Sequence, residues 1–330
     1  MSLPFTAPDL PPALASVLSG DSSLADPQLS RVLLAAASAC EEISRQLRVL
    51  SLSSPAERGG SINVQGEVQK GMDVIANDVF IGALTGHVAA MASEEDEAVI
   101  QGVGNRQYEI AFDPLDGSSN LDSNLPTGTI FGVFTHTQGA PFEGSGRDKL
   151  VAAGYALYSA STELVLSLGG GRVAMGFTFD PSRGEFVLSR PSIACPAHGP
   201  YYSVNDAREP DWPEGLRRWV RDAKRGNVPS GTKFSARYVC ALVADVHRAL
   251  LQGGWAGNPR PHLRLLYEAA PLAHIVEACG GAASDGVQDI LDIEPRGLHD
   301  RVHLFLGSKS DVAELVAYGD VQQQKTVYQA

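Results

Sequence analysis

The stretch Ala111-Phe112-Asp113-Pro114-Leu115-Asp116-Gly117-Ser118-Ser119-Asn120 places two carboxylates and a run of small polar residues directly after an apolar, strand-like segment. Carboxylates are ligands that Mg²⁺ prefers, and the ion fills its other positions with water and substrate phosphate. Backbone N–H groups of Gly117, Ser118 and Ser119 can bind phosphate oxygens, as Gly-rich turns do. The stretch therefore predicts a joint metal and phosphate site. A turn that merely ends a strand is the alternative interpretation.

Two further acidic groups precede this stretch. Ser93-Glu94-Glu95-Asp96 follows an apolar segment, Val79 to Met91, for which we predict a helix. Consecutive acids usually form a solvated surface patch, but here they can complete a site for two metal ions roughly 4 Å apart. Glu67 and Asp73 lie in a polar, Gly-flanked segment, which by itself predicts a solvent loop and a helix N-cap at Asp73.

The segment from Asp113 to Asn120, followed by Gly128-Thr129-Ile130-Phe131-Gly132, is similar to the signature of the fructose-1,6-bisphosphatase and sedoheptulose-1,7-bisphosphatase family. Similarity to family segments continues in the same order from about Leu29 to the C-terminal region. The further segments are Asn63 to Asp78, Ser93 to Asp96, Leu150 to Tyr158, Ala236 to Val239, Val243 to Arg248 and Leu263 to Glu268. The resemblance implies the α/β class and a layered α-β-α-β-α sandwich of the sugar-bisphosphatase and inositol-phosphatase type.

Position by position, the resemblance implies a set of metal ligands for two or three Mg²⁺ ions, with Mn²⁺ as an alternative metal. The implied ligands are Glu94, Glu95, Asp113, the backbone carbonyl of Leu115, Asp116 and Glu268. The resemblance also assigns Glu67 and Asp73 to activation of the attacking water, because a carboxylate within hydrogen-bond reach can accept its proton. Glu95 is expected to act in catalysis as well as in metal binding.

The two ends of the implied substrate site differ in how well they match the family. The 1-phosphate is expected to contact Gly117, Ser118, Ser119 and Arg264, and arginine suits this task because its planar fork of donors matches phosphate oxygens. Fructose enzymes of this family hold the 6-phosphate with an asparagine, three tyrosines, a lysine and an arginine from a neighbouring subunit. The matching residues here are Asn205, Arg208, Arg237, Tyr238, Asn258 and His262, of which Arg208 and Asn258 replace tyrosines and His262 replaces the lysine.

These replacements bear on the substrate. A seven-carbon sugar needs its second phosphate held farther from the metals, so we favour Mg-dependent hydrolysis of sedoheptulose-1,7-bisphosphate, with fructose-1,6-bisphosphate as the alternative or as a co-substrate. An inositol-phosphate hydrolase and a catalytically silent sugar-phosphate sensor are more remote alternatives. Animal-type fructose enzymes bind AMP through a helix start, a Lys-Tyr pair and an arginine. Here Asp26 stands at that helix start, and Gln107 and Thr135 replace the two cations, so AMP control is not expected.

Composition sets the remaining expectations. The chain has 330 residues, 44% of them hydrophobic and 19% charged, which suits two domains. We divide it at residues 195 and 196, into a metal- and phosphate-binding part (1–195) and a part that completes the sugar-phosphate site (196–330), with Pro191 to Pro200 as the junction. A net charge of −12 argues against a nucleic-acid partner. We also expect a homodimer or homotetramer, in which Arg237 reaches a neighbouring active site.

Location and secondary structure follow from simple patterns. No stretch approaches the roughly 18 apolar residues that cross a membrane, and the four cysteines, without paired spacing, suggest reduced core thiols in the cytoplasm. A plastid remains an alternative if a transit peptide was removed. Helices are predicted over Leu29 to Leu47, Asp73 to Met91, Val239 to Leu251 and Leu266 to Cys279. Strands are predicted over Tyr108 to Phe112, Thr129 to Phe134, Leu150 to Tyr158, Glu163 to Leu168, Ala174 to Asp180 and Glu185 to Ser189.

Overall fold

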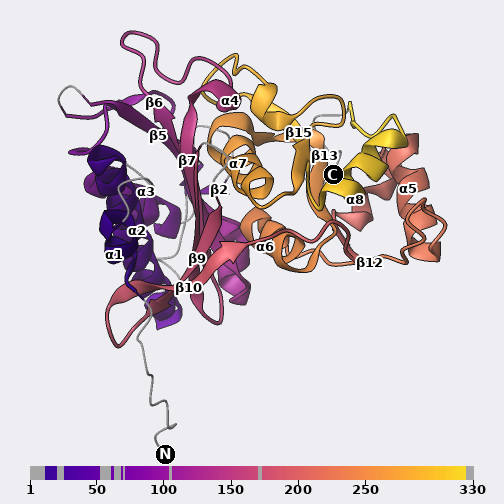
Figure 1. Cartoon of the computed structure of the whole chain (residues 1–330), viewed down its shortest axis with the longest axis horizontal. Helices are drawn as coiled ribbons and strands as arrows, with labels where there is room; N and C mark the ends of the chain where they lie inside the picture. The colour runs from indigo at the N-terminus through magenta and orange to yellow at the C-terminus, as the bar shows by residue number, and fades with distance from the viewer. Residues whose placement is uncertain are drawn as a thin grey trace, which may run out of the picture.

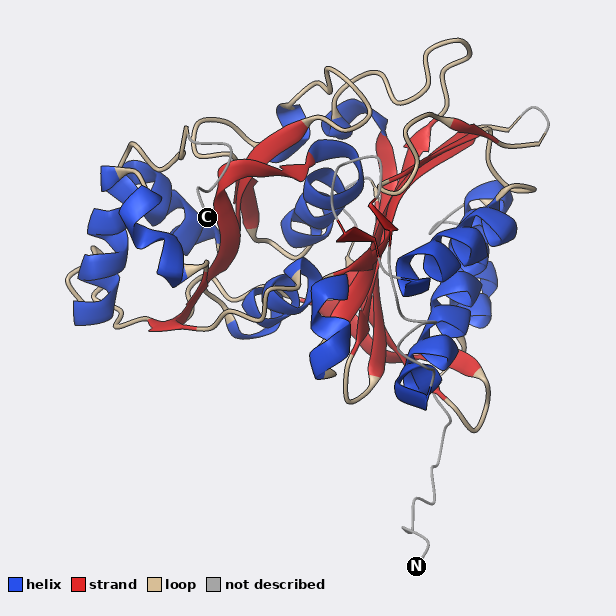
Figure 2. Ribbon diagram, turned by 180° about the vertical axis from the view of Figure 1, so that it is seen from behind, coloured by secondary structure: helices blue, strands red, loops and turns tan. Residues whose placement is uncertain are grey.

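The computed structural model describes residues 12–20, 26–52, 61–62, 68–69, 71–103, 106–169 and 173–324. They form five layers, which Figure 1 shows side by side: helices α1 to α3, a large sheet, helices α6 and α7, a second sheet, and helices α5 and α8. The same layers are seen from behind in Figure 2. The predicted α-β-α-β-α sandwich is therefore confirmed.

Three apolar clusters hold these layers together. The first lies between the outer helices and the large sheet, the second surrounds α6 and α7 between the two sheets, and the third lies beneath α5 and α8. The helices are α1 (Leu14–Gly20), α2 (Pro27–Val49), α3 (Gly71–Leu84), α4 (Gly146–Lys149), α5 (Glu214–Arg225), α6 (Leu242–Gln252), α7 (Ala270–Ala278) and α8 (Lys309–Ala317). Short helical turns are η1 (Leu50–Leu52), η2 (Ser118–Ser123), η3 (Asp206–Asp211), η4 (Leu265–Ala269) and η5 (Ile290–Asp292).

The large sheet has the strand order β10-β9-β8-β7-β6-β5-β3-β4 and is antiparallel except for the parallel pair β3 and β5. Its strands are β3 (Ala90–Ser93), β4 (Ile100–Gln101), β5 (Tyr108–Asp116), β6 (Thr127–Thr135), β7 (Leu150–Tyr158), β8 (Thr162–Leu168), β9 (Ala174–Asp180) and β10 (Glu185–Ile193). The second sheet has the order β12-β11-β13-β15-β14. Its strands are β11 (Tyr201–Ser203), β12 (Ser235–Ala236), β13 (Trp255–Arg264), β14 (Ala282–Ser284) and β15 (Arg301–Gly307). A separate two-stranded pair joins β1 (Ser61–Ile62) to β2 (Val68–Gln69).

Helix α2 follows directly from its sequence. Pro27 occupies the first turn, and the Asp26 carboxylate accepts hydrogen bonds from the backbone N–H groups of Gln28 (2.7 Å) and Leu29 (2.9 Å), which satisfies donors that a helix start leaves open. The predicted apolar stripe faces the large sheet. Its buried members are Leu29, Val32, Leu33, Ala36, Ala37, Cys40 and Ile43.

The predicted helix from Asp73 to Met91 is only partly correct. Helix α3 ends at Leu84, the chain turns, and Ala90–Ser93 forms strand β3 with every residue buried. A short apolar run that is buried on both faces carries no period that separates strand from helix. Two smaller corrections concern the C-terminal half, because α6 starts at Leu242 rather than Val239, and η4, a π-helical turn, precedes α7.

The chain passes from the large sheet to the second sheet between Ile193 and Tyr201. The division at residues 195 and 196 falls in this crossing, and we keep it as a proposal. Within the described ranges, no helix combines the length and the apolar character that a membrane span requires.

Candidate active site

The parallel pairing of β3 with β5 brings two of the acidic groups together. Ser93 lies opposite Phe112 in this pair, and the backbone N–H of Glu94 donates to the carbonyl of Phe112 at 3.2 Å. Because both strands point the same way, the acids that follow them, Glu94 beside β3 and Asp113 within β5, lie at the same edge of the sheet. The family resemblance had assigned these acids to one metal site. The parallel strand at residues 90–93 explains how they come to lie close together.

A small polar network fixes the turn that carries Glu94 and Glu95. The Ser93 hydroxyl donates to Oδ1 of Asn77 on α3 at 2.7 Å, and Nδ2 of Asn77 donates to Asp96 at 2.8 Å. The backbone N–H of Glu95 donates to the Ser93 hydroxyl at 3.1 Å. Buried, mutually satisfied polar groups of this kind rigidify their surroundings. The turn is thus held against α3, whose first turn carries Asp73.

The segment after β5 packs against the start of α6. Oδ2 of Asp116 accepts a hydrogen bond from the backbone N–H of Val243 at 2.7 Å. Gly117 has φ of +75°, and a Cβ added there would lie 2.5 Å from the Cβ of Ala241, so only glycine fits this close approach. The Asn120 side chain donates to the carbonyl of Val239 at 3.1 Å. The predicted phosphate turn therefore joins the two halves of the chain.

A cavity of about 480 Å³ opens at this junction. Acidic side chains dominate its wall, and they come from both halves of the chain. The acids are Asp73, Glu94, Glu95, Asp113, Asp116, Asp245 and Glu268. Leu115, Gly117, Ser118, Ser119 and Arg264 also line it, so the predicted metal ligands and the predicted 1-phosphate contacts share one cavity.

Arg264 balances part of this negative charge. Its side chain is 3% exposed, and its Nη1 lies 2.9 Å from Oε1 of Glu94 and 3.8 Å from Oε2 of Glu268. The backbone N–H of Arg264 also donates to Glu268 at 2.6 Å. The guanidinium thus contacts two of the predicted metal ligands instead of an open phosphate position.

Burial and crowding of like charges perturb the remaining acids. Burial, together with the nearby Glu94, Asp116 and Glu268, raises the pKa of Asp113 well above its usual range. Burial raises the pKa of Asp116 to about 7, and it raises that of Glu268 to about 8 although Arg264 opposes the shift. A cation near these groups would favour their charged forms.

The chemistry of the cavity wall fits Mg²⁺. Its buried carboxylates are hard oxygen donors, which this ion prefers and which it commonly shares with phosphate. In the described residues, no three His, Cys, Asp or Glu side chains are arranged to hold an ion as they stand. The guanidinium of Arg264 lies beside Glu94 and Glu268, two of the predicted ligands.

A second cavity, of about 220 Å³, adjoins the first. Tyr238, Cys240, Gly257, Asn258 and His262 line both cavities. Asn205 and Arg208 line only the second, and so does Arg260. Among the described residues of its wall, none is acidic. Five of the six residues predicted for the distal phosphate, Asn205, Arg208, Tyr238, Asn258 and His262, therefore line this second cavity.

Some predicted residues lie elsewhere. Arg237 lines neither cavity; it is exposed, donates to the carbonyl of Ala236 at 2.7 Å and stacks its guanidinium 5.2 Å from the ring centre of Tyr201. Glu67 is outside the described residues.

Cys240 was expected to be a core thiol, but it is exposed at the cavities. The sequence analysis assigned no role to Arg260 or Asp245, although Asp245 lies in the family segment Val243 to Arg248, and both residues line a cavity.

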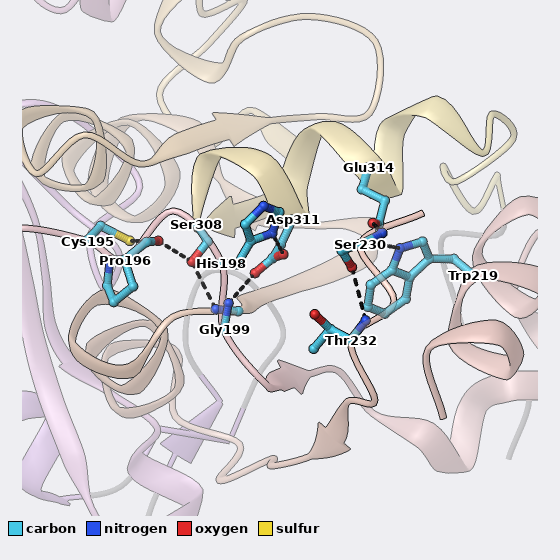
Figure 3. Close-up of polar contacts among 11 residues, drawn as sticks. Cys195, Pro196, His198, Gly199, Trp219, Ser230, Thr232, Ser308, Asp311 and Glu314 are labelled. Carbon is cyan, nitrogen blue, oxygen red and sulfur yellow. Dashed lines mark hydrogen bonds and ion pairs between the residues drawn. The ribbon is translucent and has the colours of Figure 1, made fainter. Parts of the chain in front are cut away.

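Two histidines lie in packed surroundings outside the two cavities, unlike His262, and the three tryptophans lie in an apolar cluster. The rings of His247 and His274 each lie 2.7 Å from a buried hydroxyl, of Tyr155 and Ser167 respectively. His262 lies 3.3 Å from Nη1 of Arg301 and faces the cavities. The three tryptophans pack in the cluster beneath α5 and α8, and Figure 3 shows Trp219 there, where its indole N–H donates to Glu314 at 3.2 Å.

Comparison with known proteins places this site in a family. The model of the fructose-1-6-bisphosphatase N-terminal domain matches residues 18–191, and that of the C-terminal domain matches residues 195–320. The chain belongs to the fructose-1,6-bisphosphatase family. It is 45% identical over 287 residues to the class 1 fructose-1,6-bisphosphatase of Sorangium cellulosum (strain So ce56), covering 82% of each chain.

Other members of the family are similar in sequence and in structure. Identity to the chloroplastic fructose-1,6-bisphosphatase of Brassica napus is 40% over 321 residues, covering 89% of this chain and 77% of that protein. The structure resembles the holo form of fructose-1,6-bisphosphatase from Leishmania major with a TM-score of 0.85 and 32% identity, over 94% of this chain and 100% of that one. The family consists of metal-dependent sugar-bisphosphate phosphatases.

Proposed function

We propose that this chain hydrolyses the 1-phosphate of a ketose bisphosphate, with fructose-1,6-bisphosphate as a substrate, and releases orthophosphate and the sugar monophosphate. The observation that carries this proposal is the pair of adjoining cavities, one rich in acids and one whose described wall has none. A sugar with two phosphates suits such a pair, because one phosphate can share cations with the carboxylates while the other meets arginine directly. The names of the relatives support fructose-1,6-bisphosphate in particular.

The acids of the first cavity would hold the metal ions, for which we propose Mg²⁺. Glu94, Glu95, Asp113, Asp116 and Glu268 supply carboxylates, and Leu115 supplies its backbone carbonyl. When bound, such ions polarise the phosphoryl group and stabilise the developing charge on the leaving oxygen. The chain's contribution is to hold the carboxylates at the common edge of β3 and β5, before substrate arrives.

The remaining residues would position the phosphate and move the proton. Gly117, Ser118 and Ser119 can direct backbone N–H groups at phosphate oxygens. Arg264, once released from Glu94, can donate to the same phosphate in a bidentate manner. Asp73, at the first turn of α3 and 2% exposed, lines the cavity and can accept the proton of the attacking water. Glu67 is assigned the same task by family resemblance.

We also propose sedoheptulose-1,7-bisphosphate as a substrate, hydrolysed at least as efficiently as fructose-1,6-bisphosphate. Arg208, Asn258 and His262 replace the tyrosines and lysine that fructose enzymes use, and all three line the second cavity. These side chains place their hydrogen-bond donors at other positions than the tyrosine hydroxyls and the lysine amine would, at the end of the site that lies far from the 1-phosphate. A longer sugar could place its second phosphate there while its 1-phosphate stays beside the acids.

We also propose that the protein forms a homodimer or homotetramer. Arg237 is exposed and lines neither of the two cavities of its own chain, which supports a role at a neighbouring subunit. Its stacking on Tyr201 holds the guanidinium at the surface.

Phosphate release tests the proposed function directly. Purified protein is incubated with fructose-1,6-bisphosphate and Mg²⁺, and both orthophosphate and the sugar product are measured. We expect stoichiometric formation of orthophosphate and fructose 6-phosphate, and loss of both with EDTA. If the protein binds the bisphosphate without releasing phosphate at any Mg²⁺ concentration, it is a sensor and the proposed activity is wrong.

A further inference from the structure

Strand β13 contains a wide bulge beside the second cavity. Asn258 lies opposite Leu304 of β15 and Leu263 lies opposite Val302, so residues 259–262 face the single residue His303. Bulges interrupt the alternation of a strand and re-aim side chains, often next to active sites. Here the bulge lies between two paired parts of β13, Trp255 to Asn258 and Leu263 to Arg264, and Arg264 contacts the acids.

Backbone contacts fix the shape of this bulge. The side-chain oxygen of Asn258 accepts a hydrogen bond from the backbone N–H of Arg260 at 3.1 Å. The carbonyl of Pro259 accepts one from the backbone N–H of Gln323 at 2.7 Å. The backbone on both sides of the Pro259–Arg260 peptide is therefore held in place, so little backbone entropy is lost when the Arg260 side chain at this cavity binds a ligand.

Arg260 differs from the other polar residues of the bulge in its position. Asn258 and His262 line both cavities, whereas Arg260 lines only the second. It is thus a cation on the side of the site that lies away from the seven acids. With Arg208 it gives this wall two permanent positive charges in a chain whose net charge is −12.

We propose that Arg260 binds the distal phosphate of the substrate and that the chain thereby supplies this cation from its own second cavity. The inference rests on the proposed function. Arg237, the residue that family resemblance assigns to a neighbouring site, would then contribute less than Arg260. A phosphate that lies within the second cavity can be bound in a bidentate manner by a guanidinium on its wall.

Paired substrates separate this role from a structural one. Arg260→Gln, Arg260→Lys, Arg237→Gln and the control Arg296→Gln are compared on fructose-1,6-bisphosphate and on fructose 1-phosphate, which lacks the distal phosphate. Arg296 is a suitable control because it is 82% exposed and pairs only with Asp300 among the ion pairs of the described residues. Loss of a charge-assisted hydrogen bond should lower kcat/KM for the bisphosphate about 10- to 100-fold. The rate on fructose 1-phosphate should stay unchanged.

Product binding gives a second readout that needs no turnover. Titration calorimetry with fructose 6-phosphate should show a Kd raised about 10-fold or more in Arg260→Gln and less in Arg260→Lys. An equal fall in activity on both substrates, no change with either, or a larger effect of Arg237→Gln would each overturn the inference. If the unmodified chain releases no phosphate, the proposed function is wrong, while the fructose 6-phosphate titration still decides whether Arg260 binds a sugar phosphate.

Discussion

Nη1 of Arg264 lies 2.9 Å from Oε1 of Glu94, inside a cavity where acids outnumber cations. The same Nη1 lies 3.8 Å from Oε2 of Glu268, so one buried guanidinium compensates part of the charge of two acids that we propose as metal ligands. If metal ions bind these acids, we expect them to compete with Arg264 and to release it for the substrate phosphate. Removing this guanidinium should therefore change the melting temperature of the protein, which can be measured without an activity assay.

Arg264→Met should lower the melting temperature by several degrees in EDTA, because removing one partner of a buried ion pair costs about 3–5 kcal/mol. Addition of Mg²⁺ should raise the melting temperature of the variant more than that of the unmodified chain, since the ion no longer competes with the guanidinium. Differential scanning calorimetry with and without Mg²⁺ measures both shifts. Equal Mg²⁺-induced shifts in the two proteins would show that Arg264 does not compete with the metal.

Asp116→Asn should abolish turnover and leave the fold intact. The substitution removes a ligand charge, keeps the side-chain volume and retains an oxygen that can accept from Val243. We expect kcat to fall more than about 10²-fold, as for loss of a group that stabilises transition-state charge. Asp289→Asn, at an exposed carboxylate 3.7 Å from Arg147, is the control and should leave the rate unchanged. Near-normal rates of Asp116→Asn at saturating Mg²⁺ would contradict the assignment.

The sequence alone predicted those elements and site residues that carry a local pattern, and it missed those that depend on distant strand pairing. The amphipathic stripe of α2 and the motif from Asp113 to Asn120 were readable, because each carries a local period or a local chemistry. The strand Ala90–Ser93 was not, since a short buried apolar run has no period of its own. Arg260 was not recognised either, because its place in the second cavity arises from a register shift between β13 and β15 that only the paired strand reveals.

AMP should not inhibit this enzyme at physiological concentration. The Asp26 carboxylate already accepts the backbone N–H groups of Gln28 and Leu29, and the Tyr108 hydroxyl donates to it as well. A nucleotide phosphate at this helix start would meet a negative charge. It would also lose two cationic partners, at Gln107 and Thr135, each worth about 1.5–3 kcal/mol. Steady-state rates measured across an AMP titration test this prediction. Cooperative inhibition would show that the chain has a working AMP site despite these replacements.

Cys240 should be the fastest-reacting thiol. It is the exposed one of the four cysteines, all of which the structure describes, whereas burial raises the pKa of Cys40 and of Cys279 to about 12. Because the thiolate is the reactive form, a thiol reagent should modify one equivalent rapidly, and Cys240→Ser should remove that phase. Fructose 6-phosphate should slow the same phase, since Cys240 lines both cavities. Unchanged kinetics at saturating sugar phosphate would place the ligand elsewhere.

We expect the second cavity to set the relative kcat/KM values for the two sugar bisphosphates. Arg208, Asn258 and His262 change the far end together while Gly117 and Ser118 keep the near end, so kcat/KM for sedoheptulose-1,7-bisphosphate should equal or exceed that for fructose-1,6-bisphosphate under identical Mg²⁺ and pH. The combined variant Arg208→Tyr, Asn258→Tyr and His262→Lys should move the ratio toward the six-carbon substrate. Rates on fructose 1-phosphate serve as the control, because that substrate lacks the distal phosphate that the altered residues are proposed to bind. If the unmodified enzyme prefers fructose-1,6-bisphosphate by tenfold, about 1.4 kcal/mol of transition-state binding, these three positions do not select the longer sugar.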